Sequence, residues 1–391
     1  MDFSFSEEQQ AIRDLARQIF ADFVDHERLK QLEQSGEWFD RALWSELAKA
    51  NLTALALPEE VGGSGCGLLE VCLVLEEMGR QLAPVPLLPT LLLGGLPIAA
   101  FGNAAQRERW LAPVANGEGV LTAALHEAGS ADPARPRSSA RRDRDGWQLH
   151  GEKLCVPAAQ LAGGILVPAR SDDDGVCVFL LEPGAEGVRL ERQRTTNREP
   201  QSRLELAGAR VARDALLGDP AQGSRIVEWT LERATLGLCA LQLGVAEEAL
   251  RRTAEYTTQR KQFGRPIATF QGVALRAADA YIDIEAMRAT LWQAAWRLSE
   301  ELPASLEVAS AKWWACLGGQ RVAHTAQHLH AGIGSDVDYP IHRFMLWSKQ
   351  LELTLGGANQ QLAKLGSLLV SQPRTESSRS VTSFLGWKGS R

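Results

Sequence analysis

The hydrophobic pattern of the chain changes twice, and this double change constrains the fold more than any other feature of the sequence. Apolar side chains recur at helical spacing over 5–125, which is typical of amphipathic helices. Short apolar stretches between turn residues follow over 126–218 and indicate antiparallel strands. Helical spacing then returns. The order predicts an α+β multi-domain protein with an N-terminal helical domain (1–125), a middle antiparallel β domain (126–222), a C-terminal four-helix bundle (223–370) and a loosely ordered tail (371–391).

Local signals place individual helices within this order. The sequence Ser6-Glu7-Glu8-Gln9 matches a capping box, which starts a helix by satisfying its free amide groups. Paired glycines make 57–67 a loop. Pro266 suits the first turn of a helix, where its missing N–H costs little. The predicted helices of the last region cover 224–256, the segment from GRPIATFQ to about 301, 304–331 and 341–370.

Composition excludes several classes of protein. The chain has 48 acidic and 42 basic residues, whereas nucleic-acid-binding proteins usually carry a basic surface. The longest apolar stretch, 82–102, contains four prolines and three glycines and is therefore a poor membrane span. The first residues lack the basic and apolar regions of a secretory signal. The six cysteines form no CxxC pair, so we expect reduced thiols in a cytoplasmic protein.

Motifs of classical catalysis are missing from the sequence. It contains no GxxxxGK[ST], HExxH or GxSxG, and no GxGxxG after a predicted strand. His324, His328 and His330 lie near the end of one predicted helix, but no acidic residue lies three or four positions from them. Because metal ligands must converge on one point, we expect no metal site here.

Two segments carry a pattern that composition cannot explain. The first is YTTQRKQFGRPIATFQ (256–271), and the second is HLHAGIGSDVDYPIHR (328–343). Together with the helix–strand–helix order, they resemble the acyl-CoA dehydrogenase family. The resemblance extends over essentially the whole chain, because LPEEVGGSG (57–65), the stretch 124–133 and LHGEKL (149–154) follow in the family's order.

The resemblance implies an FAD-dependent enzyme that desaturates an acyl-CoA thioester between its α and β carbons. In the family, these two segments hold the adenosine-diphosphate half of an FAD bound mainly by a neighbouring subunit. The resemblance assigns that role to Arg260, Gln262, Phe263, His328 and Gly332. Their chemistry suits it, because a guanidinium group binds a pyrophosphate through two hydrogen bonds and glycine allows close backbone approach. The alternative is that this turn only stabilises the helical bundle.

The sequence departs from the family at the catalytic base. Counting forward from the Tyr-Pro motif, the position of the family's usual glutamate base holds Leu355, which cannot accept a proton. The base position used by a minority of members, before the QFG motif, holds Ala234. Glu232 lies about 200° away around that helix and is the remaining candidate base. Glu352, one turn before Leu355, is a weaker candidate.

The segments expected to face the flavin ring also differ. The family's Thr-Glu pair is replaced by His126-Glu127, and its Trp-Ile-Thr by Cys155-Val156-Pro157. Cysteine covers far less of a flavin than tryptophan does, and proline has no backbone donor. The chain's own base and ring-facing residues are therefore altered, whereas the segment 260–271, which the family lends to a neighbour, is complete.

This asymmetry resembles one subunit of the bacterial heterotetrameric acyl-CoA dehydrogenases that act on bulky acyl-CoAs, including steroid side chains. It predicts the base-poor subunit of such an enzyme, with a second acyl-CoA dehydrogenase chain as partner. Two alternatives remain open: a self-sufficient homo-oligomer with Glu232 as its base, and a non-catalytic scaffold or acyl-CoA-binding protein with this fold. The family also implies an electron-transferring flavoprotein as electron acceptor.

Overall fold

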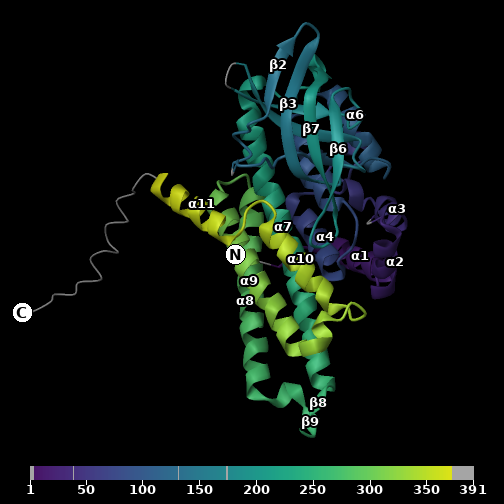
Figure 1. The fold of residues 1–391 in the computed structure, drawn as a ribbon, viewed down its shortest axis with the longest axis vertical. Coiled ribbons are helices and arrows are strands. Elements are labelled where there is room, and N and C mark those ends of the chain that lie inside the picture. The colour runs from purple at the N-terminus through teal and green to yellow at the C-terminus, as the bar shows by residue number, and fades with distance from the viewer. Residues whose placement is uncertain (1–3, 38, 131, 173–174, 372–391) are drawn as a thin grey trace, which may run out of the picture.

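The computed structural model describes residues 4–371 except 38, 131 and 173–174. The expectation of a loose tail over 371–391 therefore falls, apart from Ser371, outside the described residues. The sheet occupies one end of the long axis, and a hairpin of β8 (Lys261–Gln262) and β9 (Arg265–Pro266) occupies the other (Figure 1). This order of helices, sheet and helices confirms the predicted fold class. The exact domain boundaries stay predictions.

The N-terminal region is helical. The predicted capping box is confirmed, because Ser6 Oγ accepts from the Gln9 amide at 3.1 Å and the Gln9 side chain accepts from the Ser6 amide at 3.0 Å. The stretch 82–102 contains a π-helix, and no described helix has the length and apolar character needed to cross a membrane. The elements are α1 (Glu7–Phe23), α2 (His26–Ser35), α3 (Arg41–Lys49), 3-10 turns η1 (Leu52–Ala54) and η2 (Glu59–Val61), α4 (Leu68–Gln81), π-helix η3 (Pro89–Gly95), α5 (Leu96–Phe101) and α6 (Ala104–Ala115).

The middle region is a seven-stranded sheet with the order β1-β4-β2-β3-β7-β6, in which β5 also pairs with β4. Four strand pairs are antiparallel, as predicted, but β4 pairs in parallel with both β1 and β2. A parallel pair needs a long crossover, and the chain between β1 and β4 supplies one because it contains β2 and β3. The strands are β1 (Leu121–Ala123), β2 (Ser139–Asp143), β3 (Gly146–Pro157), β4 (Gly164–Ser171), β5 (Val176–Leu181), β6 (Val188–Arg194) and β7 (Pro200–Ala212).

The C-terminal region begins with three long helices close to their predicted positions. The single helix predicted over 341–370 is wrong, because Leu355 and Gly356 take positive φ angles of 55° and 99° and break it in two. Pro266 is also not in the first turn of a helix, since it lies in β9 and a 3-10 turn, η6 (Ile267–Thr269), follows it. The helices are α7 (Gly223–Gln259), α8 (Gln271–Ser299), α9 (Ser305–His330), α10 (Ile341–Leu353) and α11 (Ala358–Ser371), with the 3-10 turn η7 (Ala331–Ser335) after α9.

Two glycines set the contact between the N-terminal helices and the bundle. A Cβ atom at Gly244 of α7 would lie 1.9 Å from the carbonyl oxygen of Glu76 in α4. A Cβ atom at Gly79 of α4 would lie 2.2 Å from the carbonyl oxygen of Leu241 in α7. Because backbone atoms occupy both positions, α4 and α7 can approach this closely only where neither helix carries a side chain.

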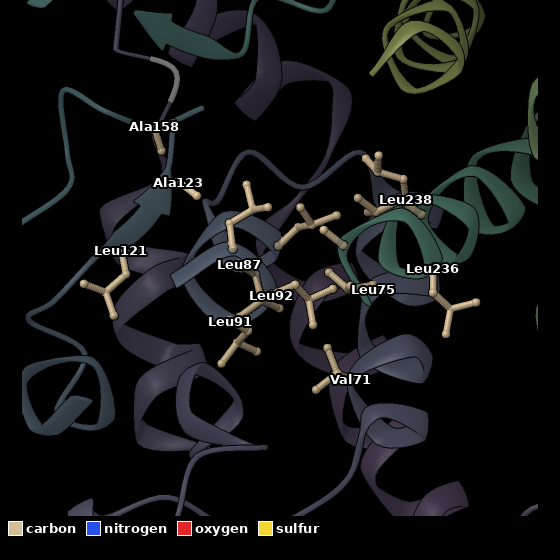
Figure 2. Packing of buried hydrophobic residues seen from close by; sticks show 14 of the residues in the cluster. Val71, Leu75, Leu87, Leu91, Leu92, Leu121, Ala123, Ala158, Leu236 and Leu238 are labelled. Atoms are coloured by element: carbon tan, nitrogen blue, oxygen red, sulfur yellow. The ribbon is translucent and has the colours of Figure 1, made fainter. Parts of the chain in front are cut away.

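Leucines of η3 fill the space between the sheet and α7. Leu91 and Leu92 are buried, and Figure 2 shows them between Leu121 of β1 and the leucines of α7. Gly237 of α7 lies against them, because a Cβ atom there would come within 2.2 Å of a methyl carbon of Leu92. The contact leaves no room for even one added methyl group at Gly237.

Candidate functional site

A tight β-hairpin follows α7. Arg260 is the C-cap of α7, and the strands β8 and β9 are joined by Phe263 and Gly264. Both residues have positive φ angles, 52° and 77°, as a type I′ turn requires. Glycine adopts this conformation freely, whereas a phenylalanine there costs on the order of 1–3 kcal/mol. The hairpin therefore holds Phe263 at the molecular surface in a strained conformation.

An open cavity of about 430 Å³ lies beside this hairpin. Phe263 is 93% exposed, and its ring meets that of Phe270 edge-on with 6.3 Å between the ring centroids. The Arg265 guanidinium lies 4.3 Å from the centroid of Phe270. Aromatic surface and guanidinium groups together suit the base and phosphates of a nucleotide. The cavity is lined by Gln262, Phe263, Ile267, Phe270, Gly272, Val273, Arg276, His328 and Leu329.

The cavity is lined by some of the residues predicted to hold the cofactor and by one further cationic residue that was not predicted. Gln262, Phe263 and His328 line it. Arg260 and Gly332 are exposed nearby in sequence but are not among its lining residues. Arg276, which the sequence analysis missed, supplies a cation to the wall from the second turn of α8. The sequence signal that could have identified Arg276 is its position about one helical turn after the motif that ends at residue 271. The roles of all these residues stay predictions.

The end of α9 connects the cavity to η7. His330 is buried there and stacks on Tyr256 with 4.4 Å between the ring centroids. Its Nδ1 donates to the carbonyl of Ala326 at 2.8 Å, and burial lowers its pKa, so the ring is neutral near pH 7. Within the described ranges, no group of three or more His, Cys, Asp or Glu side chains is placed to hold a metal ion.

A buried ion pair fixes the segment expected to face the flavin ring. The Nζ of Lys153 lies 2.6 Å from Oε1 of Glu127, and the two side chains are 0% and 4% exposed. Lys153 also donates to the carbonyl of Pro168 at 2.8 Å, and Glu127 accepts from the Ser138 hydroxyl at 2.6 Å. These contacts join the segment after β1 to β3 and β4, so they set where the neighbouring residues of β3 lie.

The ring-facing part of β3 is irregular. Its pairing with β7 shifts register between Lys153 and Val156, and Cys155 between them has a positive φ of 51°. Cys155 is exposed, and its amide donates to the Gln193 side chain at 2.8 Å. Pro157 follows without an N–H group. This strand therefore offers a flavin neither a large aromatic surface nor a side-chain hydroxyl at these positions.

The turn 354–357 lies between α10 and α11, at the position that the family resemblance gives to the base. Leu355 occupies it in the left-handed conformation and is half-buried against the core. The carbonyl oxygens of Leu355 and Gly356 accept from the Gln361 side chain at 3.2 and 3.3 Å. The turn is thus ordered by hydrogen bonds, but its side chain at position 355 is apolar.

The two candidate bases have other partners. Oε1 of Glu232 accepts from the hydroxyl of Ser305 at 2.5 Å, and Ser305 is the first residue of α9. A carboxylate near a helix N-terminus is favourable for the helix dipole. Glu352 pairs with Lys349 at 2.6 Å. A catalytic role of Glu232 stays a prediction, and the structure gives this side chain a structural contact.

The predicted cofactor-facing groups of this chain do not surround one site. The hairpin with its cavity lies at the end of the long axis opposite the sheet, whose strand β3 carries Cys155 (Figure 1). The cavity and the predicted ring-facing residues therefore do not form one site within this chain.

The sequence matches two models of one protein family. Residues 6–118 match the N-terminal domain of acyl-CoA dehydrogenases, and residues 221–367 match the C-terminal domain. A curated relative, the acyl-CoA dehydrogenase FadE27 of Mycobacterium tuberculosis, is 38% identical over 381 residues, which cover 95% of this chain and 100% of the relative.

Two solved structures are similar in both sequence and fold. A variant of the Tcur3481-Tcur3483 steroid ACAD is 47% identical, with a TM-score of 0.87 and coverage of 93% of this chain and 98% of its own. The ChsE4-ChsE5 complex from Mycobacterium tuberculosis is 39% identical, with a TM-score of 0.91 and coverage of 96% and 100%. Both the hairpin and the turn 354–357 lie within the matched C-terminal domain.

Proposed function

Because this chain belongs to the acyl-CoA dehydrogenase family, whose members are FAD-dependent oxidoreductases, we propose that it is the base-poor subunit of a heteromeric enzyme for a bulky acyl-CoA. Bound FAD supplies the acceptor for the hydride that leaves the β carbon. The observation that carries the proposal is the turn 354–357. The turn is ordered by hydrogen bonds, yet Leu355 stands at the position to which the family resemblance assigns the base.

The chain's own residues fit one half of the cofactor better than the other. The cavity beside the hairpin offers Phe263 for stacking and Arg276 for a phosphate, which suits an adenosine diphosphate. The ring-facing strand offers Cys155 and Pro157, which suit a flavin ring poorly. In the proposed complex this chain binds the diphosphate half, and the partner chain holds the flavin ring and the base.

The packing of η3 also supports the proposal that the reacting part of the site lies on the partner chain. The family resemblance implies that the size of an acyl pocket depends on how the segment 82–102 packs against α7. Here Leu91 and Leu92 fill that space and lie against Gly237. We therefore assign the acyl pocket, like the base, to the partner chain.

The similar structures named above as a steroid ACAD and as a complex of two chain types support a bulky acyl-CoA, such as a steroid side chain, and a heteromeric assembly. An electron-transferring flavoprotein is the proposed acceptor.

The flavin content of the lone chain tests this proposal directly. We expect the chain purified alone to be nearly colourless, because its ring-facing strand is altered, and to become yellow and active when co-purified with its partner. Visible absorbance and the flavin-to-protein ratio after heat release measure this. In the active complex, Phe263→Ala should lower the FAD content. One flavin per lone chain would overturn the proposal, and a colourless, inactive complex would favour the scaffold alternative.

Glu232→Gln separates the heteromer from a self-sufficient enzyme. We expect the variant complex to keep its flavin and to turn over within about twofold of the parent, because amide and carboxylate both accept the Ser305 hydrogen bond. Steady-state turnover of the complex is the measurement, and Glu228→Gln, on the exposed surface of the same helix, is the control. A loss of turnover by several orders of magnitude, with flavin retained, would instead identify Glu232 as the base.

A further inference from the structure

A lysine is buried in the bundle without a carboxylate partner. Lys312 of α9 is 1% exposed, and among the described residues no ion pair is formed by it. The other fully buried lysine, Lys153, lies 2.6 Å from the carboxylate of Glu127. Burying a charged group that has no partner of opposite charge costs several kcal/mol of folding free energy. The position of Lys312 therefore requires an explanation beyond ordinary core packing.

Its hydrogen bond leads to the end of α10. Lys312 Nζ donates to the carbonyl of Leu351 at 2.5 Å, and the Cys316 thiol, one turn further along α9, donates to the carbonyl of Glu352 at 3.3 Å. The last carbonyls of a helix have no partner within the helix. Two side chains of α9 thus satisfy the C-terminal carbonyls of α10, immediately before the turn 354–357.

The surroundings of Lys312 identify the end of α10 as the group that balances its charge. Burial raises the pKa of the Cys239 thiol to about 12 and also raises that of Cys316, so both groups are neutral thiols. The C-terminus of a helix carries a partial negative charge, which favours a cation within its last turn. Lys312 therefore belongs with the end of α10 and the turn that follows.

The turn itself is also held by α11. Gln361 donates to the carbonyls of Leu355 and Gly356, at 3.2 and 3.3 Å, and the amide of Gly357 donates to the Gln360 side chain at 3.0 Å. Lys312 and Cys316 hold the residues before the turn, and Gln360 and Gln361 hold the turn itself. Leu355 lies between these two anchors in a left-handed conformation that leucine rarely adopts unaided.

We infer that Lys312 is a positioning residue, whose buried charge fixes the end of α10 and thereby the place of the side chain at position 355. The inference rests on the proposed function only in identifying position 355 with the base position of the family. A cation buried without a carboxylate partner is a cost to the fold and not a gain. Stability alone therefore does not explain Lys312, whereas the placement of the turn does.

Hydrogen exchange of the lone, full-length chain tests this inference without any flavin or partner. Lys312→Met keeps the length of the side chain and removes its charge. We expect amides of 354–361 to exchange about tenfold faster or more, while those of α8 exchange as in the parent. In a methyl NMR spectrum of leucine-labelled protein, the Leu355 signals, assigned by their loss in Leu355→Ile, should shift or split. The control is Lys349→Met in α10, the helix whose end Lys312 contacts. Lys349 pairs with Glu352, so its replacement also removes a lysine charge from this region but should change neither readout.

Two outcomes would overturn the inference. One is unchanged exchange and unchanged Leu355 signals in Lys312→Met; the other is an equal acceleration in every helix, which would indicate only a lower global stability. If Lys312→Met does not fold, Cys316→Ala removes the neighbouring donor alone, and it should loosen 354–361 by a smaller factor without changing α8. These results do not depend on flavin content, so they are separate from the test of the proposed heteromer.

Discussion

Replacing Glu127 by glutamine should lower the free energy of unfolding by about 3–5 kcal/mol, because it leaves the charge of Lys153 buried without a partner. Both side chains are almost fully buried. Ser138 donates to Oε1 of Glu127 and the Arg137 amide donates to Oε2, whereas glutamine has only one acceptor oxygen, so the change removes the charge together with one of these acceptors. Urea unfolding of the lone chain, followed by circular dichroism, measures the effect.

Glu152→Gln is the matched control on the same strand. Glu152 pairs with Arg203 at 2.6 Å, but the two side chains are 37% and 40% exposed. A solvent-exposed pair of this kind contributes about 0–1 kcal/mol, so the control should unfold close to the parent. Equal losses in the two variants would contradict the special cost that we assign to the buried charge.

The same pair predicts a dependence of stability on pH. Burial alone would raise the pKa of Glu127, but the charge of Lys153 and the hydrogen bonds from Lys153, Ser138 and Arg137 outweigh it, so the pKa lies below its usual value. A lowered pKa stabilises the fold above the unfolded-state value of about 4.3, and this contribution is lost as the pH falls through the folded-state pKa. The parent should therefore lose more stability than Glu127→Gln does between about pH 5 and pH 3.

Gly244→Ala should destabilise the protein by about 3 kcal/mol or more, because the new methyl group overlaps the backbone of α4. Its Cβ would lie 1.9 Å from the Glu76 carbonyl oxygen and 2.8 Å from the Arg80 amide nitrogen. Backbone atoms cannot rotate away as a side chain can, so the two helices must separate along their contact. Thermal unfolding of the lone chain, or its failure to accumulate as folded protein, is the measurement.

Gly366→Ala in α11 provides a control of opposite sign. Apart from its chain neighbours and the nearby backbone of α11, no described atom lies within 4 Å of a Cβ placed at Gly366, and alanine favours a helix over glycine by up to about 1 kcal/mol. We therefore expect a small stabilisation from this substitution. If both alanines changed the unfolding midpoint in the same direction and by similar amounts, the close approach of α4 and α7 would not limit stability at Gly244.

These two sites matter for the proposed function because both fix the parts that the proposed heteromeric site would use. The Glu127–Lys153 pair places the irregular strand that carries Cys155, and the contact at Gly244 places α7, which leads to the hairpin. A destabilised variant should therefore lose the complex with its partner as well as its own stability, since binding stabilises only the folded chain.

Much of the fold followed from local patterns. The capping residues Ser6 and Gln9 and the three long helices of the bundle were predictable, because a helix start or an amphipathic face depends on residues within a few positions of one another. The parallel pairing of β4 and the break at Leu355 were not. The parallel pairing depends on segments far apart in sequence, about which periodicity carries no information. The break at Leu355 had a local signal, the paired glycines 356 and 357, but the helical spacing over 341–370 outweighed it in the prediction.

For the site, the sequence by itself determined which residue types are present and in which motif: a complete hairpin segment and a leucine at the base position. Only the tertiary structure decided what these residues meet. It placed Arg276 and Phe263 in the wall of one cavity. It also formed the hydrogen bond between Glu232 and Ser305, 73 positions apart, and that between Lys312 and the carbonyl of Leu351, 39 positions apart. The physical reason is that hydrophobic spacing acts between near neighbours in the chain, whereas the partner of a buried polar group depends on how whole helices pack.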